Sequence, residues 1–132
     1  MALLALLLAG LTWHQTDVWA SEAALWTRAH SVAPTTPRPL IGLAWVSLRA
    51  GRLEEAERWL DQATAVSARQ TPPERVLTLD SVDTTRAVMW MRRGKLVQAA
   101  RLMAHAPEHS ERWALCQQYR RVCALADSPS LP

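Results

Sequence analysis

Residues 51–63, GRLEEAERWLDQA, decide the fold, because a similar stretch, GKLVQAARLMAHA, occupies residues 94–106. The two stretches are offset by 43 residues, and five positions are identical: Gly51/Gly94, Leu53/Leu96, Ala56/Ala99, Arg58/Arg101 and Ala63/Ala106. Self-similarity at such a period is typical of proteins built from stacked structural repeats. The chain therefore contains at least two copies of one supersecondary unit.

The repeated stretch predicts a hairpin of two helices. Apolar residues of the second helix recur every three or four positions and therefore share one face: Leu53, Ala56, Leu60 and Ala63. The preceding segment carries a matching stripe of Leu40, Leu43, Ala44 and Leu48. Gly51 suits the turn between them, because glycine readily adopts the left-handed conformation that ends a helix.

This pattern resembles the tetratricopeptide repeat (TPR) family, in which the first helix carries a small residue, the turn a glycine and the second helix an Ala, large apolar, Ala series. The series here is Ala56, Leu60 and Ala63. The resemblance covers residues 37–63 well and residues 80–106 in part, since Arg86 stands where an apolar residue is expected. It implies an all-α fold, a short TPR-like α-solenoid of antiparallel helix hairpins with a C-terminal capping helix.

Helix start and stop signals give the remaining boundaries. Helices are predicted over residues 37–50, 52–69, 71–93, 95–106 and 110–126. Thr71 and Glu74 form a capping box around Pro72, which is a strong helix start. The 71–93 helix is longer than its counterpart in the first hairpin, which accounts for the 43-residue offset. Its first turns are expected to project beyond the neighbouring hairpin, unless Asp80 and Asp83 break it.

Cys116 and Cys123 both lie on the last predicted helix. A separation of seven residues along a helix is about 10.5 Å. This is more than the roughly 7 Å between Cα atoms that a disulfide can bridge. The two cysteines are therefore predicted to be unpaired small apolar side chains.

Residues 2–11, ALLALLLAGL, form an uninterrupted apolar run. Extended to Trp13 as a helix, it covers about 18 Å, less than the roughly 30 Å of bilayer hydrocarbon. Three interpretations stay open: the end of a longer transmembrane helix, a signal peptide, and an amphiphilic or core helix of the solenoid. We expect the first, because Trp13 and Trp19 fall where an interfacial belt belongs. The chain then divides into a membrane-associated segment (1–16), a helical repeat domain (17–127) and a disordered tail (128–132).

Residues 17–33 fit the second helix of a degenerate repeat, with Trp26 at the position of Leu60. An apolar helix that leads through a Trp-containing segment into a TPR domain resembles the C-terminal portion of bacterial multi-spanning membrane proteins, including lipid-linked-sugar glycosyltransferases. That resemblance implies a membrane location, with the helical domain on the extracytoplasmic (periplasmic) side. The alternatives are the C-terminal regulatory fragment of such a membrane glycosyltransferase and a soluble TPR adaptor.

The sequence carries no motif for catalysis or cofactor binding. Its four glycines form no GxGxxG, P-loop or GxSxG pattern. His105 and His109 have the spacing of metal ligands, but Pro107 interrupts the helix that would align them. We therefore predict no enzyme activity, no cofactor and no metal site. A net charge of +3 with dispersed basic residues does not indicate nucleic-acid binding.

The predicted function is non-catalytic protein–protein interaction. In TPR solenoids the first helix of each hairpin lines the concave face. The resemblance thus implies a binding surface of eight residues: Arg38, Ile41, Trp45 and Arg49 from one helix, and Ser81, Thr84, Val88 and Arg92 from the next.

Arginines are expected to form a basic rim on this surface, because Arg49 and Arg92 occupy equivalent repeat positions and Arg38 lies on the same face. Guanidinium groups pair well with carboxylates, and an aromatic anchor such as Trp45 can carry much of the binding energy. The expected partner is therefore a protein or peptide with an acidic group beside an apolar side chain. A neighbouring repeat or the membrane surface is the alternative occupant of this face.

Overall fold

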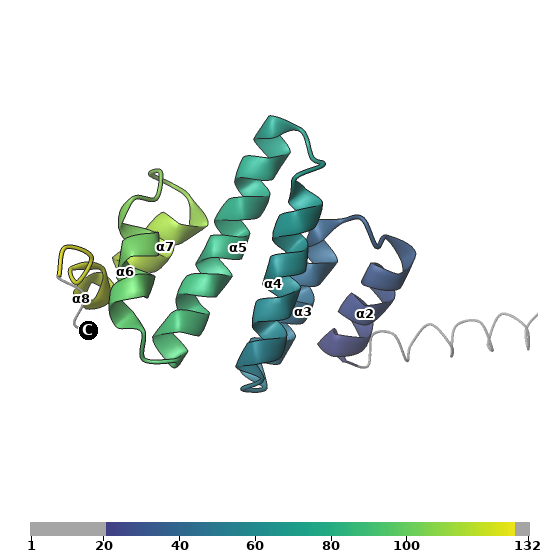
Figure 1. Ribbon diagram of the computed structural model, residues 1–132, viewed down its shortest axis with the longest axis horizontal. Coiled ribbons are helices and arrows are strands. Elements are labelled where there is room, and N and C mark those ends of the chain that lie inside the picture. Colours follow the sequence, from purple (N-terminus) through teal and green to yellow (C-terminus); the bar gives the residue numbers. More distant parts are fainter. Residues whose placement is uncertain (1–20, 129–132) are drawn as a thin grey trace, which may run out of the picture.

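The computed structural model describes residues 21–128, which form an array of helices (Figure 1). The described helices are α2 (Glu22–Val32), α3 (Pro37–Arg49), α4 (Leu53–Ser67), α5 (Pro72–Arg92), α6 (Leu96–Ala104), α7 (Glu111–Gln118) and α8 (Arg120–Cys123). The expected membrane-associated segment, residues 1–16, lies outside the described residues, as does the tail from residue 129. None of the helices within 21–128 has the length and apolar character needed to cross a membrane.

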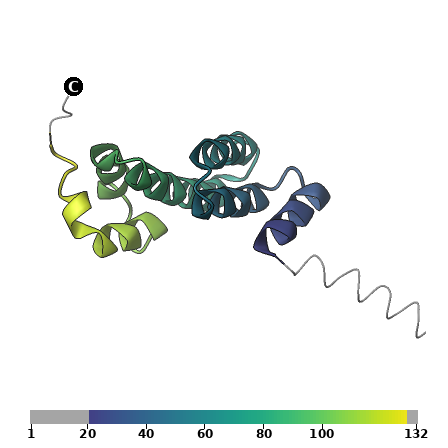
Figure 2. The ribbon, with the colours of Figure 1, turned by 90° about the horizontal axis from the view of Figure 1, so that it is seen from below.

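The helices pair into hairpins that stack along one axis. Helices α3 and α4 form the first hairpin, and α5 and α6 form the second, while α2 and the α7–α8 pair lie at opposite ends of the array (Figures 1 and 2). Helix α3 contacts α5, and α5 contacts α7, so the first helices of successive units are neighbours. The all-α, TPR-like solenoid expected from the sequence is confirmed.

Glycine closes both hairpins in the same way. Gly51 has a φ of 76° and Gly94 a φ of 74°, the left-handed conformation that favours glycine. The residue after each glycine donates its N–H back into the preceding helix, Arg52 to the Ser47 carbonyl and Lys95 to the Trp90 carbonyl, both at 2.9 Å. The two turns therefore repeat in geometry as well as in sequence.

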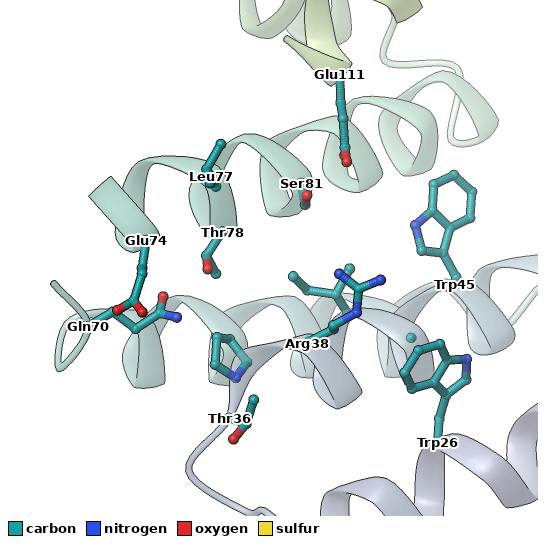
Figure 3. A pocket seen from close by; sticks show the side chains of 13 residues that line it. Trp26, Thr36, Arg38, Trp45, Gln70, Glu74, Leu77, Thr78, Ser81 and Glu111 are labelled. Carbon is teal, nitrogen blue, oxygen red and sulfur yellow. The ribbon is translucent and has the colours of Figure 1, made fainter. Parts of the chain in front are cut away.

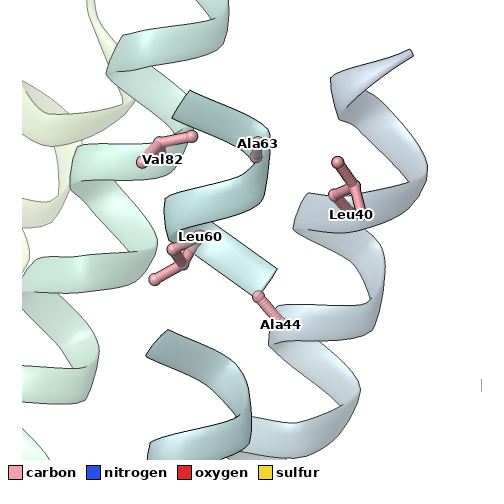
Figure 4. Close-up of a cluster of buried hydrophobic side chains, with 5 residues drawn as sticks. All are labelled: Leu40, Ala44, Leu60, Ala63 and Val82. Carbon is pink, nitrogen blue, oxygen red and sulfur yellow. The ribbon is translucent and has the colours of Figure 1, made fainter. Parts of the chain in front are cut away.

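Small residues let the helices of each hairpin approach closely. In Figure 4 the side chains that meet between α3, α4 and α5 are Leu40, Ala44, Leu60, Ala63 and Val82. A second cluster joins Leu48, Ala56 and Met89 across the same three helices, and Ala56 is fully buried. The equivalent alanine of the second repeat, Ala99, is also fully buried. The core thus uses the repeated alanines as predicted.

Ion pairs join the two hairpins, one of them at position 86, where an apolar residue was expected. Arg86 reaches across to Asp61 of α4, with 2.9 Å between Nη2 and Oδ1. Arg93 donates to Glu57 at 2.8 Å and to Glu54 at 3.3 Å. The side chains of both arginines are less than a quarter exposed. The departure of Arg86 from the repeat pattern therefore reflects a contact with the neighbouring helix.

Helix α5 runs through its acidic residues without a break. Glu74 accepts hydrogen bonds from the backbone N–H and the hydroxyl of Thr71, which completes its start. Its first turns project beyond the first hairpin, as expected (Figure 1). Val76 and Leu77 there are 63% and 72% exposed.

The prediction for the last helix is wrong. The helix expected over 110–126 divides into α7 and α8, because Tyr119 between them has φ −113° and ψ 48°, outside the helical region. The chain turns there and brings the Cα atoms of Cys116 and Cys123 to 5.7 Å, where they form a disulfide. The sequence argument failed because it measured the separation along one straight helix.

Enlarging a repeated alanine should destabilise the fold. We expect Ala56→Leu or Ala99→Leu to lower the free energy of unfolding by about 1–3 kcal/mol, because extra methyl groups overpack a filled contact. Ala65→Leu is the matched control, since Ala65 is exposed on the same helix as Ala56. Thermal melts followed by circular dichroism measure the effect. Equal midpoints for Ala56→Leu and Ala65→Leu would contradict the packing described above.

Removing the disulfide should destabilise the C-terminal end. We expect Cys116→Ser/Cys123→Ser to lower the free energy of unfolding by about 2–3 kcal/mol, the chain-entropy effect of opening a short loop. A reducing agent should affect the parent similarly and leave the variant unchanged. Thiol titration of the unfolded, unreduced parent gives an independent check, and two free thiols per chain would refute the pairing.

Candidate binding groove

A groove of about 450 Å³ lies between α3 and α5 (Figure 3). Trp26 of α2 and Trp45 of α3 stand at one end, and Gln70 and Glu74 stand at the other. The full lining is Trp26, Thr36, Pro37, Arg38, Ile41, Gly42, Trp45, Gln70, Glu74, Leu77, Thr78, Ser81 and Glu111. This volume lies within the range of about 300–1,000 Å³ that is typical of ligand sites.

Four of the eight predicted binding residues line this groove: Arg38, Ile41, Trp45 and Ser81. Thr84 and Val88 of α5 are not among the lining residues. The Thr84 hydroxyl donates to the Asp80 carbonyl of its own helix at 2.7 Å. Val88 packs against the cluster formed by Leu48, Ala56 and Met89. The open surface therefore centres on the N-terminal half of α3.

The other two predicted arginines bind groups of this chain. Arg49 forms an ion pair with the Glu22 carboxylate of α2. Arg92 donates from Nη1 to the Leu48 carbonyl near the end of α3, at 2.6 Å, where a positive charge is favourable. Both guanidinium groups therefore join helices of this chain. The expected basic rim of three arginines is wrong, and Arg38 alone of the three lines the groove.

Arg38 is the basic side chain of the groove. It is exposed, its guanidinium points into the space between α3 and α5 (Figure 3), and it makes no ion pair or hydrogen bond with the described residues 21–128. Ile41 and Trp45 follow it along the same face of α3, and both are half-buried. One unneutralised cation beside an apolar strip is suited to a ligand with a carboxylate next to an apolar side chain.

Two carboxylates limit the charge that such a ligand can carry. Glu111, at the start of α7, extends toward the groove (Figure 3). Glu74 lines the opposite end of the groove and accepts hydrogen bonds from Thr71. Like charges placed together across an interface are unfavourable. An acidic group placed near either of these carboxylates would therefore meet like charge.

An ionic network holds α7, and with it Glu111, against α5. Arg112 donates to Asp80 at 2.7 Å and to Asp83 at 3.3 Å, and the Glu111 backbone N–H donates to Asp80 at 2.8 Å. Burial raises the pKa of the Asp83 carboxyl above its usual value, and the nearby Arg112 charge opposes that rise. The acidic residues considered as helix breakers thus serve as the docking point of α7.

Trp26 and Gly42 are groove residues that sequence reasoning missed. A Cβ atom added to Gly42 would lie 2.2 Å from Trp26 Cδ2, so the indole occupies the space that glycine leaves open on α3. The indole N–H donates to Glu22 at 3.3 Å. The Glu22 pKa is lowered mainly by the hydrogen bond from Arg49 and further by that from Trp26. Gly42 could have predicted this contact, because a small residue midway along the first helix indicates a point where a neighbouring element packs closely.

The groove ends at an unsatisfied acceptor. The Oε1 atom of Gln70, in the turn between α4 and α5, is buried and has no hydrogen-bond partner among the described residues. Thr78 and Ser81 line the same part of the groove with hydroxyl groups. The hydroxyl groups are therefore the hydrogen-bonding groups that this end of the groove offers to a ligand.

The described residues 21–128 contain no cluster of three or more His, Cys, Asp or Glu side chains that could hold a metal ion. His109 packs against Trp113, with ring centroids 5.5 Å apart, and it adopts a positive φ of 65° after Pro107.

In a comparison with known families, residues 37–62 match the tetratricopeptide repeat. The matched stretch comprises α3 and most of α4, the hairpin that supplies Arg38, Ile41 and Trp45. Searches against curated proteins and against solved structures return no match.

Proposed function

We propose that this TPR-like array is a protein-interaction module whose groove between α3 and α5 binds a short peptide segment. Tetratricopeptide repeats are generally non-catalytic and bind proteins or peptides, and the matched repeat contains one wall of the groove. The observation that carries the proposal is Arg38, whose guanidinium lies in the groove beside Ile41 and Trp45 and pairs with none of residues 21–128.

The proposed ligand has one carboxylate beside an aromatic or large aliphatic side chain. The carboxylate pairs with Arg38, and the apolar side chain packs on Ile41 and Trp45. Glu74 and Glu111 select against additional acidic residues. The hydroxyl groups of Thr78 and Ser81 offer hydrogen bonds to the ligand.

Peptide selection tests this proposal. Peptides selected by phage display on the full chain should share an acidic residue next to an apolar one. Measured by fluorescence polarisation, Arg38→Glu and Trp45→Ala should each weaken their binding at least about tenfold, the equivalent of one charge-assisted contact or one anchor. Arg58→Glu is the matched control, because Arg58 is exposed on α4 and is not part of the groove lining.

The proposal fails if the selected peptides bind equally to the parent, Arg38→Glu and Trp45→Ala. It also fails if peptides with acidic runs bind best, since the two groove carboxylates should repel them. Circular dichroism of each variant establishes that the fold is retained, so that a loss of binding reports on the groove.

We also propose that the chain is membrane-associated through residues 1–16 and works outside the reducing cytosol. The apolar run at residues 2–11 supports the first part. The Cys116–Cys123 disulfide supports the second, because disulfides persist in oxidising compartments. The alternatives remain a regulatory fragment of a membrane glycosyltransferase and a soluble adaptor.

Deleting residues 1–16 should move the protein from the membrane fraction to the soluble fraction. The helical signal in circular dichroism should remain, because the hairpin cores lie within residues 37–104. Fractionation of the full-length and shortened chains after expression measures the effect. A full-length chain found in the soluble fraction would end this proposal without affecting the groove.

A further inference from the structure

Helix α2 is held less firmly than the hairpins beside it. Each of α3, α4, α5 and α6 contains buried residues, whereas none of Glu22–Val32 is buried. Among the described helices α2 contacts α3, and its His30 ring also makes an edge contact with Trp59 of α4. A segment with few buried contacts opens more readily than the core of its domain.

Two side chains of α2, one helical turn apart, contact α3 in a specific way. Glu22 places its carboxylate on Arg49, and Trp26 places its indole over Gly42. The indole N–H also donates to Glu22, so carboxylate and aromatic ring form one unit. This is an acidic group beside an apolar one, the same chemistry proposed for the groove ligand.

The α2 contact and the groove are continuous. Trp26 and Gly42 belong to the groove lining, and Arg49 lies two turns beyond Gly42 on α3. If α2 left, the free surface of α3 would extend from Arg38 to Arg49. Both arginines predicted on this helix would then be available to a ligand.

We propose that α2 is an internal competitor for this surface, displaced by a partner helix that carries a carboxylate four residues before an aromatic side chain. The proposal rests on the proposed binding function and adds its regulation. The apparent affinity for the partner helix equals the affinity of the open surface multiplied by the fraction of molecules in which α2 is undocked. Loosening α2 therefore raises that affinity without changing the surface itself.

The test uses the full-length chain and a fluorescent synthetic peptide of residues 21–33, which carries the Glu22–Trp26 pair. The variant Glu22→Gln/Trp26→Ala should bind this probe about tenfold more tightly than the parent, if α2 is docked roughly nine-tenths of the time in the parent. A probe with the same two substitutions is the control and should not bind. Circular dichroism should show that the variant keeps the helices of its two hairpins.

Two further variants locate the binding. Added to Glu22→Gln/Trp26→Ala, either Gly42→Ala or Arg49→Gln should remove the gain, because the first fills the space for the indole and the second removes the carboxylate partner. Arg58→Glu should leave probe affinity within about twofold, because Arg58 is exposed on α4 and is not part of the groove lining. The groove proposal is tested separately with display-selected peptides, so its failure is distinguishable from failure of this one. Equal probe affinity for parent and variant, or a gain that survives Gly42→Ala and Arg49→Gln, would overturn the proposal.

Discussion

The close approach of α3, α4 and α5 over alanine side chains is the constraint on which the rest of the structure depends. Ala44, Ala56 and Ala63 are fully buried, and each lies where a larger side chain would push two helices apart. The same clusters bring Val82 and Met89 of α5 close to α3, so α3 and α5 are neighbours. The groove is therefore a consequence of small residues that do not themselves line it.

Much of the fold could be predicted because its signals are local. The positive φ of Gly51 and Gly94, the capping box at Thr71 and the buried repeated alanines all follow from patterns within a few residues. The bend at Tyr119 had no such signal, so the disulfide was missed. Four of the eight predicted binding residues line the groove, because helical periodicity predicts which residues face the concave side. Periodicity does not predict which of these side chains stay unpaired, because that depends on partners far away in the sequence.

Arginine illustrates this limit, since residues of one type perform different tasks here. Arg93 and Arg86 join the hairpins, Arg112 holds α7, and Arg49 holds α2. Their carboxylate partners lie 25 or more positions away along the chain, beyond the reach of sequence periodicity. Arg38 differs because its part of the groove supplies no acid within ion-pair distance. Because its guanidinium pairs with no described residue, Arg38 is a candidate binding residue, whereas the paired arginines are structural.

A nuclear magnetic resonance titration of the ¹⁵N-labelled chain with a display-selected peptide would test most directly whether the face between α3 and α5 is the binding surface. The indole N–H of each tryptophan gives a separate signal, which allows the two faces to be compared in one spectrum. We expect the largest shift changes at the Trp45 indole and at the backbone amides of Ile41 and Ser81, with little change at Trp59 on α4. Changes centred on Trp59 and the outer face of α4 would contradict this assignment.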